Sequence, residues 1–233
     1  MIESLKHSLK ALLTPLCLRI RNGPLQGYKW IAVSGSKFIK GNYEPRQTEI
    51  FKQHVQKGDM ILDIGAHVGY YTVLAAVLAG PSGKVIAFEP RPINLRFLRR
   101  HIEVNGLSNV TVIEACVSRA SGEARFDTHT GTGTGHLSET GNLAVRTVSL
   151  DHLLNQGQIG KPKLIKMDVE GAEQDVLAGA EQTIQSARPV MIISTHGPEN
   201  FTGVSKFLDR HGYRAEVLPG KEDAPGKEIV ALP

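Results

Sequence analysis

Cysteine is scarce in this chain, whose 233 residues include only Cys17 and Cys116. Two isolated cysteines cannot build a disulfide framework and lack the spacing of a zinc site, so they favour a reducing compartment. The sequence also lacks any run of 18 apolar residues and therefore predicts no membrane span. Its N-terminus has no apolar stretch followed by a small-residue cleavage site, which argues against a signal peptide. We therefore expect a cytoplasmic protein.

The sequence also has no large excess of positive over negative residues, or the reverse. Lysine and arginine number 27 and aspartate and glutamate number 23, which gives a net charge of +4. This mild positive charge is compatible with an anionic ligand but does not indicate a nucleic-acid partner. Hydrophobic residues make up 41% of the chain and charged residues 21%, a composition that suits one globular domain with a sizeable core.

The first 56 residues carry weaker patterns than the rest. Residues 2–16 place leucine and isoleucine at helical spacing, which predicts a helix packed on the body of the protein or on a second subunit. The second arrangement would make a homo-oligomer. A membrane-surface helix is a further possibility that only a few cations support. Beyond it, we expect a hairpin formed by residues 28–33 and 37–40, and an amphipathic helix over residues 44–56.

A glycine turn stands at the centre of the sequence pattern. Residues 60–64 are four apolar residues around an aspartate, which predicts a short buried strand. Gly65 and Gly69 follow at once, and residues 73–79 predict a buried helix that ends at Gly80. Because glycine has no Cβ, a ligand can approach the main chain closely at this turn.

Apolar strand patterns alternate with helical patterns in the rest of the chain. We expect strands at residues 84–88, 109–115, 163–167, 189–194, 213–217 and 228–231, with helices at 93–102, 172–186 and 201–211. This alternation is typical of an α/β fold in which a parallel sheet is covered on both faces. Residues 123–126 and 144–149 are expected to pair as antiparallel strands. The Gly/Thr-rich residues 128–138 between them predict a loop, either a plain surface loop or a lid over a substrate.

Polar residues gather where the predicted strands end. Ligands of open parallel sheets bind beyond the carboxyl ends of the strands. The candidates at these ends, in strand order, are Asp63 and Gly65, Glu89, then Glu114, Ala115 and Cys116, then Asp168 and Glu170, and finally His196. Glu89 lies 24 residues after Gly65, where a carboxylate can accept two hydrogen bonds from a ribose diol.

The residues of the turn decide which nucleotide ligand fits. A dinucleotide site needs G-x-G-x-x-G so that the main chain can touch a pyrophosphate, but His67 stands where the middle glycine should be. Asp63 in front of the turn would repel a pyrophosphate and suits a ligand that carries a cation. These features favour S-adenosylmethionine (SAM) over NAD as the cofactor.

Four segments resemble the FkbM family of SAM-dependent methyltransferases in order and spacing. They are residues 63–72, 87–90, 149–151 and 165–173, and the resemblance extends over residues 25–196. It implies a Rossmann-like class I methyltransferase fold, with a mainly parallel seven-stranded sheet whose last strand is antiparallel. Residues 1–56 would form a helical or irregular cap on a SAM-binding methyltransferase domain formed by residues 57–233. The chain departs from the family at His67, where asparagine is usual, and at Ser194-Thr195, where an acidic residue often stands.

The implied reaction is transfer of a methyl group to a hydroxyl oxygen of a small molecule, a sugar or a natural product. Cofactor-binding candidates are Asp63, Gly65, His67, Gly69, Glu89, Glu114, Ala115, Cys116 and Asp168. Catalytic candidates are Asp168, Glu170 and His196, because a hydroxyl is a weak nucleophile that a nearby base would assist. These three could instead ligate a divalent metal, which we consider the less favoured reading. Glu173 is expected to stabilise a helix start.

Other functions are less consistent with the sequence. A SAM-binding partner protein without catalysis would not need the intact acidic segment 166–173, and an NAD-dependent oxidoreductase is disfavoured by the turn. Methyltransferases that act on nitrogen usually carry Asn/Asp-Pro-Pro-aromatic after the fourth strand, whereas this chain has Asp-Val-Glu-Gly at 168–171.

Overall fold

The computed structural model describes residues 16–128, 135–219 and 226–233. The predicted N-terminal helix and the middle of the Gly/Thr-rich tract, residues 129–134, lie outside the described residues. Within the described parts of the chain, no helix is long and apolar enough to cross a membrane.

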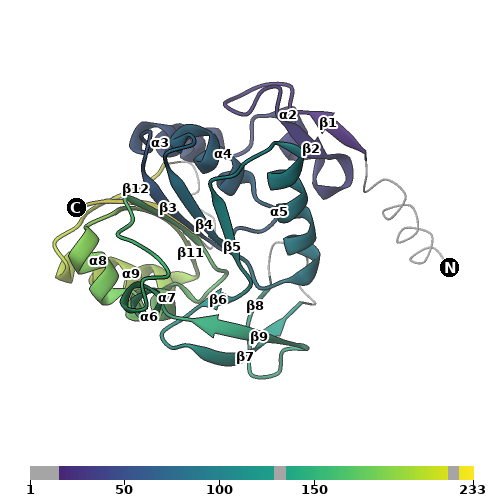
Figure 1. Ribbon diagram of the computed structural model, residues 1–233. Coiled ribbons are helices and arrows are strands. Elements are labelled where there is room, and N and C mark those ends of the chain that lie inside the picture. The colour runs from purple at the N-terminus through teal and green to yellow at the C-terminus, as the bar shows by residue number, and fades with distance from the viewer. Residues whose placement is uncertain (1–15, 129–134, 220–225) are drawn as a thin grey trace.

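A seven-stranded sheet forms the centre of the molecule (Figure 1). Its strand order is β12 (Arg214–Val217), β13 (Gly226–Leu232), β11 (Val190–His196), β10 (Leu164–Asp168), β3 (Met60–Ile64), β4 (Lys84–Phe88) and β5 (Val110–Ile113). The five strands from β11 to β5 are parallel, and β13 runs antiparallel to both β11 and β12. The predicted α/β fold with a mainly parallel sheet is therefore confirmed.

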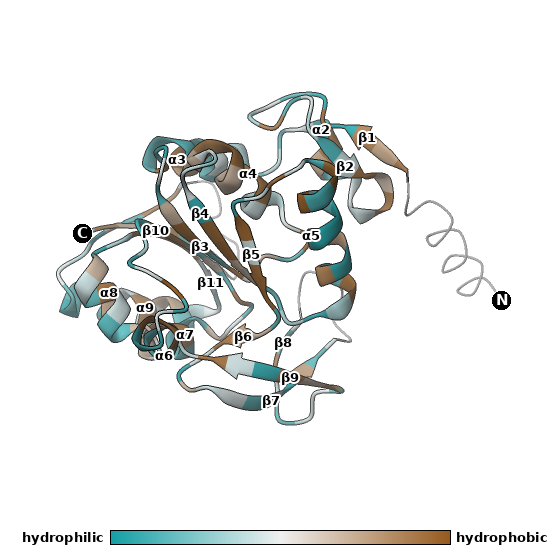
Figure 2. Ribbon diagram, in the orientation of Figure 1, coloured by the Kyte–Doolittle hydropathy of each residue, from teal (hydrophilic) through white to brown (hydrophobic). Residues whose placement is uncertain are grey.

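Helices cover both faces of this sheet, and the strands themselves are strongly apolar (Figure 2). One face carries α6 (Leu150–Asn155), α7 (Glu173–Ala178), α8 (Glu181–Ala187) and α9 (Pro198–Arg210); the other carries α2 (Ser36–Lys40), α3 (Pro45–His54), α4 (Tyr70–Ala79) and α5 (Pro92–Val104). Alternation along β3 shows the division: Leu62 belongs to the first core and Ile61 to the second.

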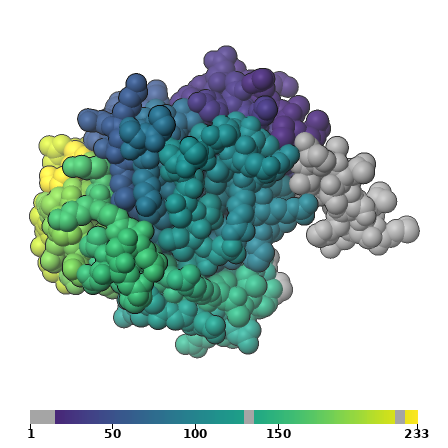
Figure 3. Space-filling view, viewed as in Figure 1, coloured from purple at the N-terminus to yellow at the C-terminus, as the bar shows by residue number. Residues whose placement is uncertain are grey.

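A second, four-stranded sheet is inserted between β5 and β10. It consists of β6 (Cys116–Val117), β9 (Leu143–Val148), β7 (Gly122–Asp127) and β8 (His136–Leu137), in that order. The antiparallel pairing predicted for residues 123–126 and 144–149 is confirmed by β7 and β9. In the space-filling view these strands lie at the bottom of the molecule, at the end opposite the purple residues near β1 and β2 (Figure 3). The loop predicted over 128–138 is wrong at His136 and Leu137, because they pair with β7.

The predicted hairpin of residues 28–33 and 37–40 is wrong. β2 (Lys29–Ile31) instead pairs antiparallel with β1 (Cys17–Arg19), after which a short 3₁₀ helix, Ala32–Ser34, leads into α2. Consecutive burial of Phe38 and Ile39 suits a helix better than a strand with one buried face, and Gly41 ends α2 in the left-handed conformation.

The single helix predicted over 172–186 is divided into α7 and α8. Gly179 ends α7, and a Cβ there would lie 2.2 Å from the Ser118 carbonyl oxygen. Asp151 accepts hydrogen bonds from the main-chain nitrogens of Gln182 (3.0 Å) and Thr183 (2.7 Å), which caps the start of α8. The cap comes from a residue about 30 positions earlier in the chain, so the uninterrupted helical pattern over 172–186 could not show that a second helix begins here.

A buried histidine, His101, joins α5 to the N-terminal segment. Its ring stacks on Trp30 with centroids 3.7 Å apart, its Nδ1 lies 2.7 Å from the Val68 carbonyl oxygen, and its Nε2 accepts from the Ile31 main-chain nitrogen at 3.1 Å. Both ring nitrogens are satisfied in the neutral form, with Nδ1–H donating to Val68. Burial lowers the pKa of His101 to about 4.

Stability should therefore depend on pH through His101. The unfolded chain takes up this proton below about pH 6.5, the ordinary histidine pKa, whereas the folded protein resists it down to about pH 4. We expect the free energy of unfolding to fall by about 3 kcal/mol between these pH values from this group alone. Urea unfolding at several pH values measures the slope, which His101→Gln should reduce. The exposed His152→Gln is the matched control, and an equal slope in all three proteins would contradict the assignment.

Candidate active site

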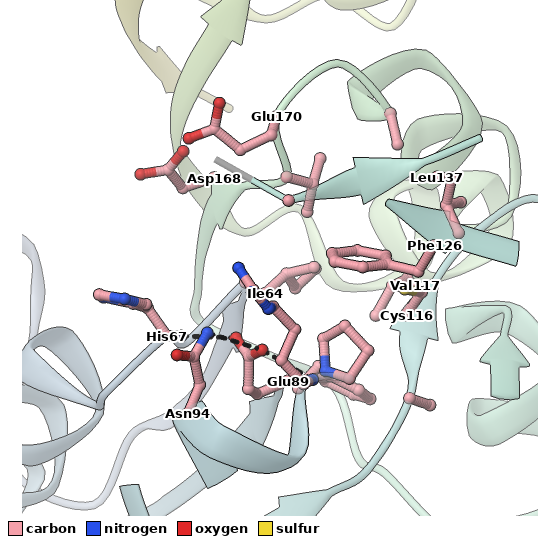
Figure 4. A pocket seen from close by; sticks show the side chains of 18 residues that line it. Ile64, His67, Glu89, Asn94, Cys116, Val117, Phe126, Leu137, Asp168 and Glu170 are labelled. Atoms are coloured by element: carbon pink, nitrogen blue, oxygen red, sulfur yellow. Dashed lines mark hydrogen bonds between the residues drawn. The ribbon is translucent and has the colours of Figure 1, made fainter. Parts of the chain in front are cut away.

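A pocket lies beyond the carboxyl ends of β3, β4 and β10, where the sequence predicted a ligand site. It encloses about 550 Å³, part of which is open solvent. Its walls come from the glycine turn after β3, the end of β4, the second sheet and the segment after β10. In Figure 4 the carboxylates of Asp168 and Glu170 lie at one side of this pocket, Glu89 lies near His67 and Asn94, and apolar side chains form another wall.

Glu89 is a buried acidic group of the pocket whose carboxylate accepts three hydrogen bonds. It is 4% exposed, and its carboxylate accepts hydrogen bonds from the main-chain nitrogens of His67 (2.8 Å) and Arg91 (2.9 Å) and from Asn94 Nδ2 (3.1 Å). Burial raises the pKa of Glu89, while these hydrogen bonds oppose the shift. Glu89 thus ties the glycine turn to the start of α5. Sequence reasoning missed the partners Arg91 and Asn94, although their position at the start of the next helix was a usable signal.

The glycine turn has an unusual main-chain conformation. Gly65 has φ +81°, and a Cβ on it would lie 1.9 Å from the Asp168 carbonyl oxygen, so only glycine fits. His67 adopts φ +52° without being glycine, which costs conformational energy. Its Nε2 is buried and has no hydrogen-bond partner within the described residues. Burial lowers the pKa of His67 to about 4, so the ring is neutral at physiological pH.

The apolar wall of the pocket comes mainly from the second sheet. Ala115 and Cys116, which were predicted at the end of the third strand, line it, and burial raises the pKa of the Cys116 thiol to about 12. Val117, Phe126 and Leu137 complete the wall. Phe126 and Leu137 were missed because their place depends on how an inserted sheet folds back, which periodicity does not reveal.

Three predicted cofactor residues do not line the pocket. The Asp63 side chain is buried and accepts a hydrogen bond from the Thr72 hydroxyl in α4, and burial raises its pKa to about 6. Gly69 packs under Leu98, whose Cδ1 would be 2.5 Å from an added Cβ. Glu114 is exposed and forms an ion pair with Arg99.

The three predicted catalytic residues do come together. His196 Nε2 lies 3.7 Å from Asp168 Oδ1 and 3.4 Å from Glu170 Oε2. Suitable ligand atoms of Asp168, Glu170 and His196, which we call the carboxylate–histidine cluster, all lie within 4.8 Å of one another. Glu170 occupies the left-handed region at φ +53°, a strained conformation of the kind found at functional sites. Burial, with the nearby carboxylates of Asp168 and Glu173, raises the pKa of Glu170 although His196 opposes this.

Glu173 belongs to this arrangement, which sequence reasoning did not foresee. It is fully buried, and its Oε1 accepts hydrogen bonds from His196 Nδ1 (2.8 Å) and from the Gly171 main-chain nitrogen (3.0 Å). The contact fixes the His196 ring and assigns the proton to Nδ1, which leaves Nε2 toward the two other carboxylates. The prediction placed Glu173 at a helix start, and Glu173 is indeed the first residue of α7. It did not include the hydrogen bond to His196.

A buried lysine, Lys166, forms an ion pair with Asp168. Lys166 is 2% exposed, its Nζ lies 3.6 Å from Asp168 Oδ2, and it sits 5.2 Å from the centre of the Tyr71 ring. Burial disfavours its charge, but the carboxylates of Asp168, Glu228 and Glu44 together raise its pKa. Lys166 therefore stays charged and pairs with Asp168.

The pocket residues fit SAM. The apolar wall can accept a flat purine ring, the buried Glu89 carboxylate offers lone pairs for ribose hydroxyls, and the Gly65 turn permits close approach of a ligand to the main chain. The unpartnered His67 Nε2 adds a polar atom that a ligand in the pocket could satisfy.

Comparisons with known proteins agree with this geometry. A family model described as the methyltransferase FkbM domain matches residues 63–215. The chain is 28% identical to the hexuronic acid methyltransferase AglP of Haloferax volcanii over 73% of this chain and 70% of that protein. It is 30% identical to the 2-O-methyltransferase NoeI of Sinorhizobium fredii, over 65% of this chain and 72% of that one.

A solved structure supports the fold. The crystal structure of a methyltransferase FkbM from Methylobacillus flagellatus superposes with a TM-score of 0.57 at 19% identity. The match covers 79% of this chain and 50% of that one, so this chain spans about half the length of that protein.

Proposed function

The chain belongs to the FkbM methyltransferase family, and from that membership we propose that it is a SAM-dependent O-methyltransferase that acts on a hydroxyl of a small, sugar-like molecule. The observation that carries the proposal is the convergence of Asp168, Glu170 and His196 beside a pocket that suits the cofactor. Such a cluster serves to receive a hydroxyl group and its proton, a task that methyl transfer to oxygen requires.

The cofactor would occupy the pocket between the glycine turn and the second sheet. When bound, SAM supplies an electrophilic methyl group on a sulfonium leaving group. Glu89 would hold the ribose, Ala115 and Cys116 would contact the adenine, and Gly65 and His67 would face the methionine end. Asp168 and Glu170 line the same pocket and also belong to the cluster, so they connect the two parts of the site.

The acceptor would lie on the side of the cluster away from the apolar wall. The chain's main contribution is to align the hydroxyl oxygen with the methyl group, which can be worth several kcal/mol of the barrier. The cluster then takes up the hydroxyl proton as the new carbon–oxygen bond forms and the carbon–sulfur bond breaks. The names of the two relatives, a hexuronic acid methyltransferase and a 2-O-methyltransferase, favour a carbohydrate hydroxyl as the acceptor.

Ligand-dependent melting tests the cofactor part of the proposal. S-adenosylhomocysteine at about 100 times its dissociation constant should stabilise the protein by about 2.7 kcal/mol. For a chain of this size that corresponds to a rise in melting temperature of about 5–10 °C. NAD should leave the melting temperature unchanged, and a shift with NAD but not with S-adenosylhomocysteine would refute the proposal.

An acceptor screen tests the reaction itself. Transfer of labelled methyl from SAM to monosaccharides, uronic acids and their methyl glycosides should label oxygen, and amino-sugar nitrogen should remain unlabelled. A protein that binds S-adenosylhomocysteine but methylates none of these would favour the alternative of a non-catalytic SAM-binding partner.

A further inference from the structure

We propose that Asp168, Glu170 and His196 bind one divalent cation of the Mg²⁺ or Mn²⁺ class. The binding site stands on geometry alone; the role we give the cation, holding the acceptor hydroxyl, rests on the proposed function. Carboxylate oxygens with one imidazole nitrogen form a ligand set that suits these hard or borderline metals.

The spacing of the three side chains leaves room for an ion between them. His196 Nε2 is 3.4 Å from Glu170 Oε2 and 3.7 Å from Asp168 Oδ1, longer than the 2.7–2.9 Å of a charge-assisted hydrogen bond. Neighbouring ligands in an octahedral site with bonds of about 2.1 Å stand about 3 Å apart. Small side-chain adjustments would therefore bring the three atoms onto one metal ion.

The His196 ring is held as metal-binding histidines are held. Its Nδ1–H donates to Glu173 Oε1 at 2.8 Å, so Nε2 is directed toward Asp168 and Glu170, where its lone pair would face a bound cation. A carboxylate behind the imidazole is the usual outer partner of a ligating histidine, because it fixes the tautomer and makes the ligand nitrogen more basic.

A separate observation concerns charge. Glu173 is fully buried, and its Oε2 has no hydrogen-bond partner within the described residues. Three carboxylates, Asp168, Glu170 and Glu173, thus stand close together around His196. Lys166 lies 3.6 Å from Asp168 and contributes one permanent positive charge. A buried carboxylate with an unsatisfied oxygen is costly unless positive charge lies nearby. A divalent cation bound to Asp168, Glu170 and a neutral His196 would offset this concentration of negative charge.

The cation would assist the reaction by binding the acceptor oxygen. Metal coordination lowers the pKa of an oxygen-bound proton. With the cation bound, the three side chains would therefore act through the metal, and the hydroxyl proton would pass to solvent water instead of to the cluster itself. Transfer then forms the carbon–oxygen bond, breaks the carbon–sulfur bond and releases S-adenosylhomocysteine. The ligands come from β10, the loop after it and β11, so the metal would also fix their relative positions.

Direct binding of Mn²⁺ tests the site without relying on activity. The full chain, freed of metal by chelation and dialysis, should bind about one equivalent of Mn²⁺ by electron paramagnetic resonance. Asp168→Asn should abolish that binding, and Glu173→Gln, which removes the charge behind His196, should weaken it by about 10- to 100-fold. The exposed Glu199→Gln on α9 is the matched control and should bind as the wild type does.

The outcomes separate this inference from the proposed function. Absence of Mn²⁺ binding by the folded wild-type protein would overturn the metal site. Methyl transfer that is unchanged after chelation would overturn the role of the cation in the reaction. If Glu173→Gln does not fold, His196→Asn serves instead, because its amide can keep the contact with Glu173 while Nε2 is lost. The melting shift with S-adenosylhomocysteine should survive chelation, because the contacts proposed for the cofactor at Glu89, Gly65 and the apolar wall do not involve the metal. Loss of that shift in untreated wild-type protein would instead refute the proposed function.

Discussion

His196→Asn is expected to lower kcat for methyl transfer by about 10²–10⁴-fold, the range that one proton-transfer group contributes. An asparagine amide can occupy the position of Nδ1 and donate to Glu173, so the buried carboxylate keeps its partner. What the variant loses is Nε2, the atom directed toward Asp168 and Glu170. The effect should therefore fall on chemistry and not on folding.

Steady-state kinetics and melting curves together check this prediction. The melting shift with S-adenosylhomocysteine should match the wild type, because His196 does not line the cofactor pocket. The exposed His152→Asn provides a control for histidine loss elsewhere. A variant that binds S-adenosylhomocysteine and methylates at the wild-type rate would remove His196 from the reaction.

Glu89→Gln is expected to weaken S-adenosylhomocysteine binding by about 10- to 100-fold. Hydrogen bonds to a charged group contribute about 1.5–3 kcal/mol, and the substitution removes the charge and one of the two acceptor oxygens. The glutamine also has to serve the main-chain nitrogens of His67 and Arg91, so little acceptor capacity remains for a ribose. Turnover of the bound complex should change much less than binding does.

Isothermal titration calorimetry measures the dissociation constant of S-adenosylhomocysteine for each variant. The chain also contains a matched control. Glu114→Gln alters another glutamate that the sequence placed at a strand end, but the structure shows it exposed and paired with Arg99. Its dissociation constant should equal the wild-type value. Equal constants for Glu89→Gln and the wild type would exclude Glu89 from the cofactor site, and weakening in Glu114→Gln alone would favour the original strand-end assignment.

The sheet and its ligand-binding edge could be predicted because local patterns determine them. Short apolar runs such as residues 84–88 leave few alternatives to a buried strand, and carboxyl ends of parallel strands share one edge. Asp168, Glu170 and His196 therefore met as expected, although two of them are 28 residues apart.

Features that depend on contacts between distant segments could not be predicted in this way. Glu173 fits a helix start as well as it fits a histidine contact, and only the folded chain brings it against His196. Asp63 was placed toward the ligand, but the period of two along its strand puts it on the face of Ile61, beneath Thr72. The division of α7 from α8 depends on Asp151, which caps α8 from about 30 residues away in sequence.

The close approach of Gly65 to Asp168 has a consequence for redesign. Main chain lies against main chain at this point, with 1.9 Å between an added Cβ and the Asp168 carbonyl oxygen. Main-chain contact therefore sets the separation between the turn that we propose for the donor and the strand end that we propose for the acceptor. An engineer who wants a larger acceptor therefore cannot widen the site here, and should vary the partly exposed His136 on β8 instead, leaving the donor–acceptor spacing untouched.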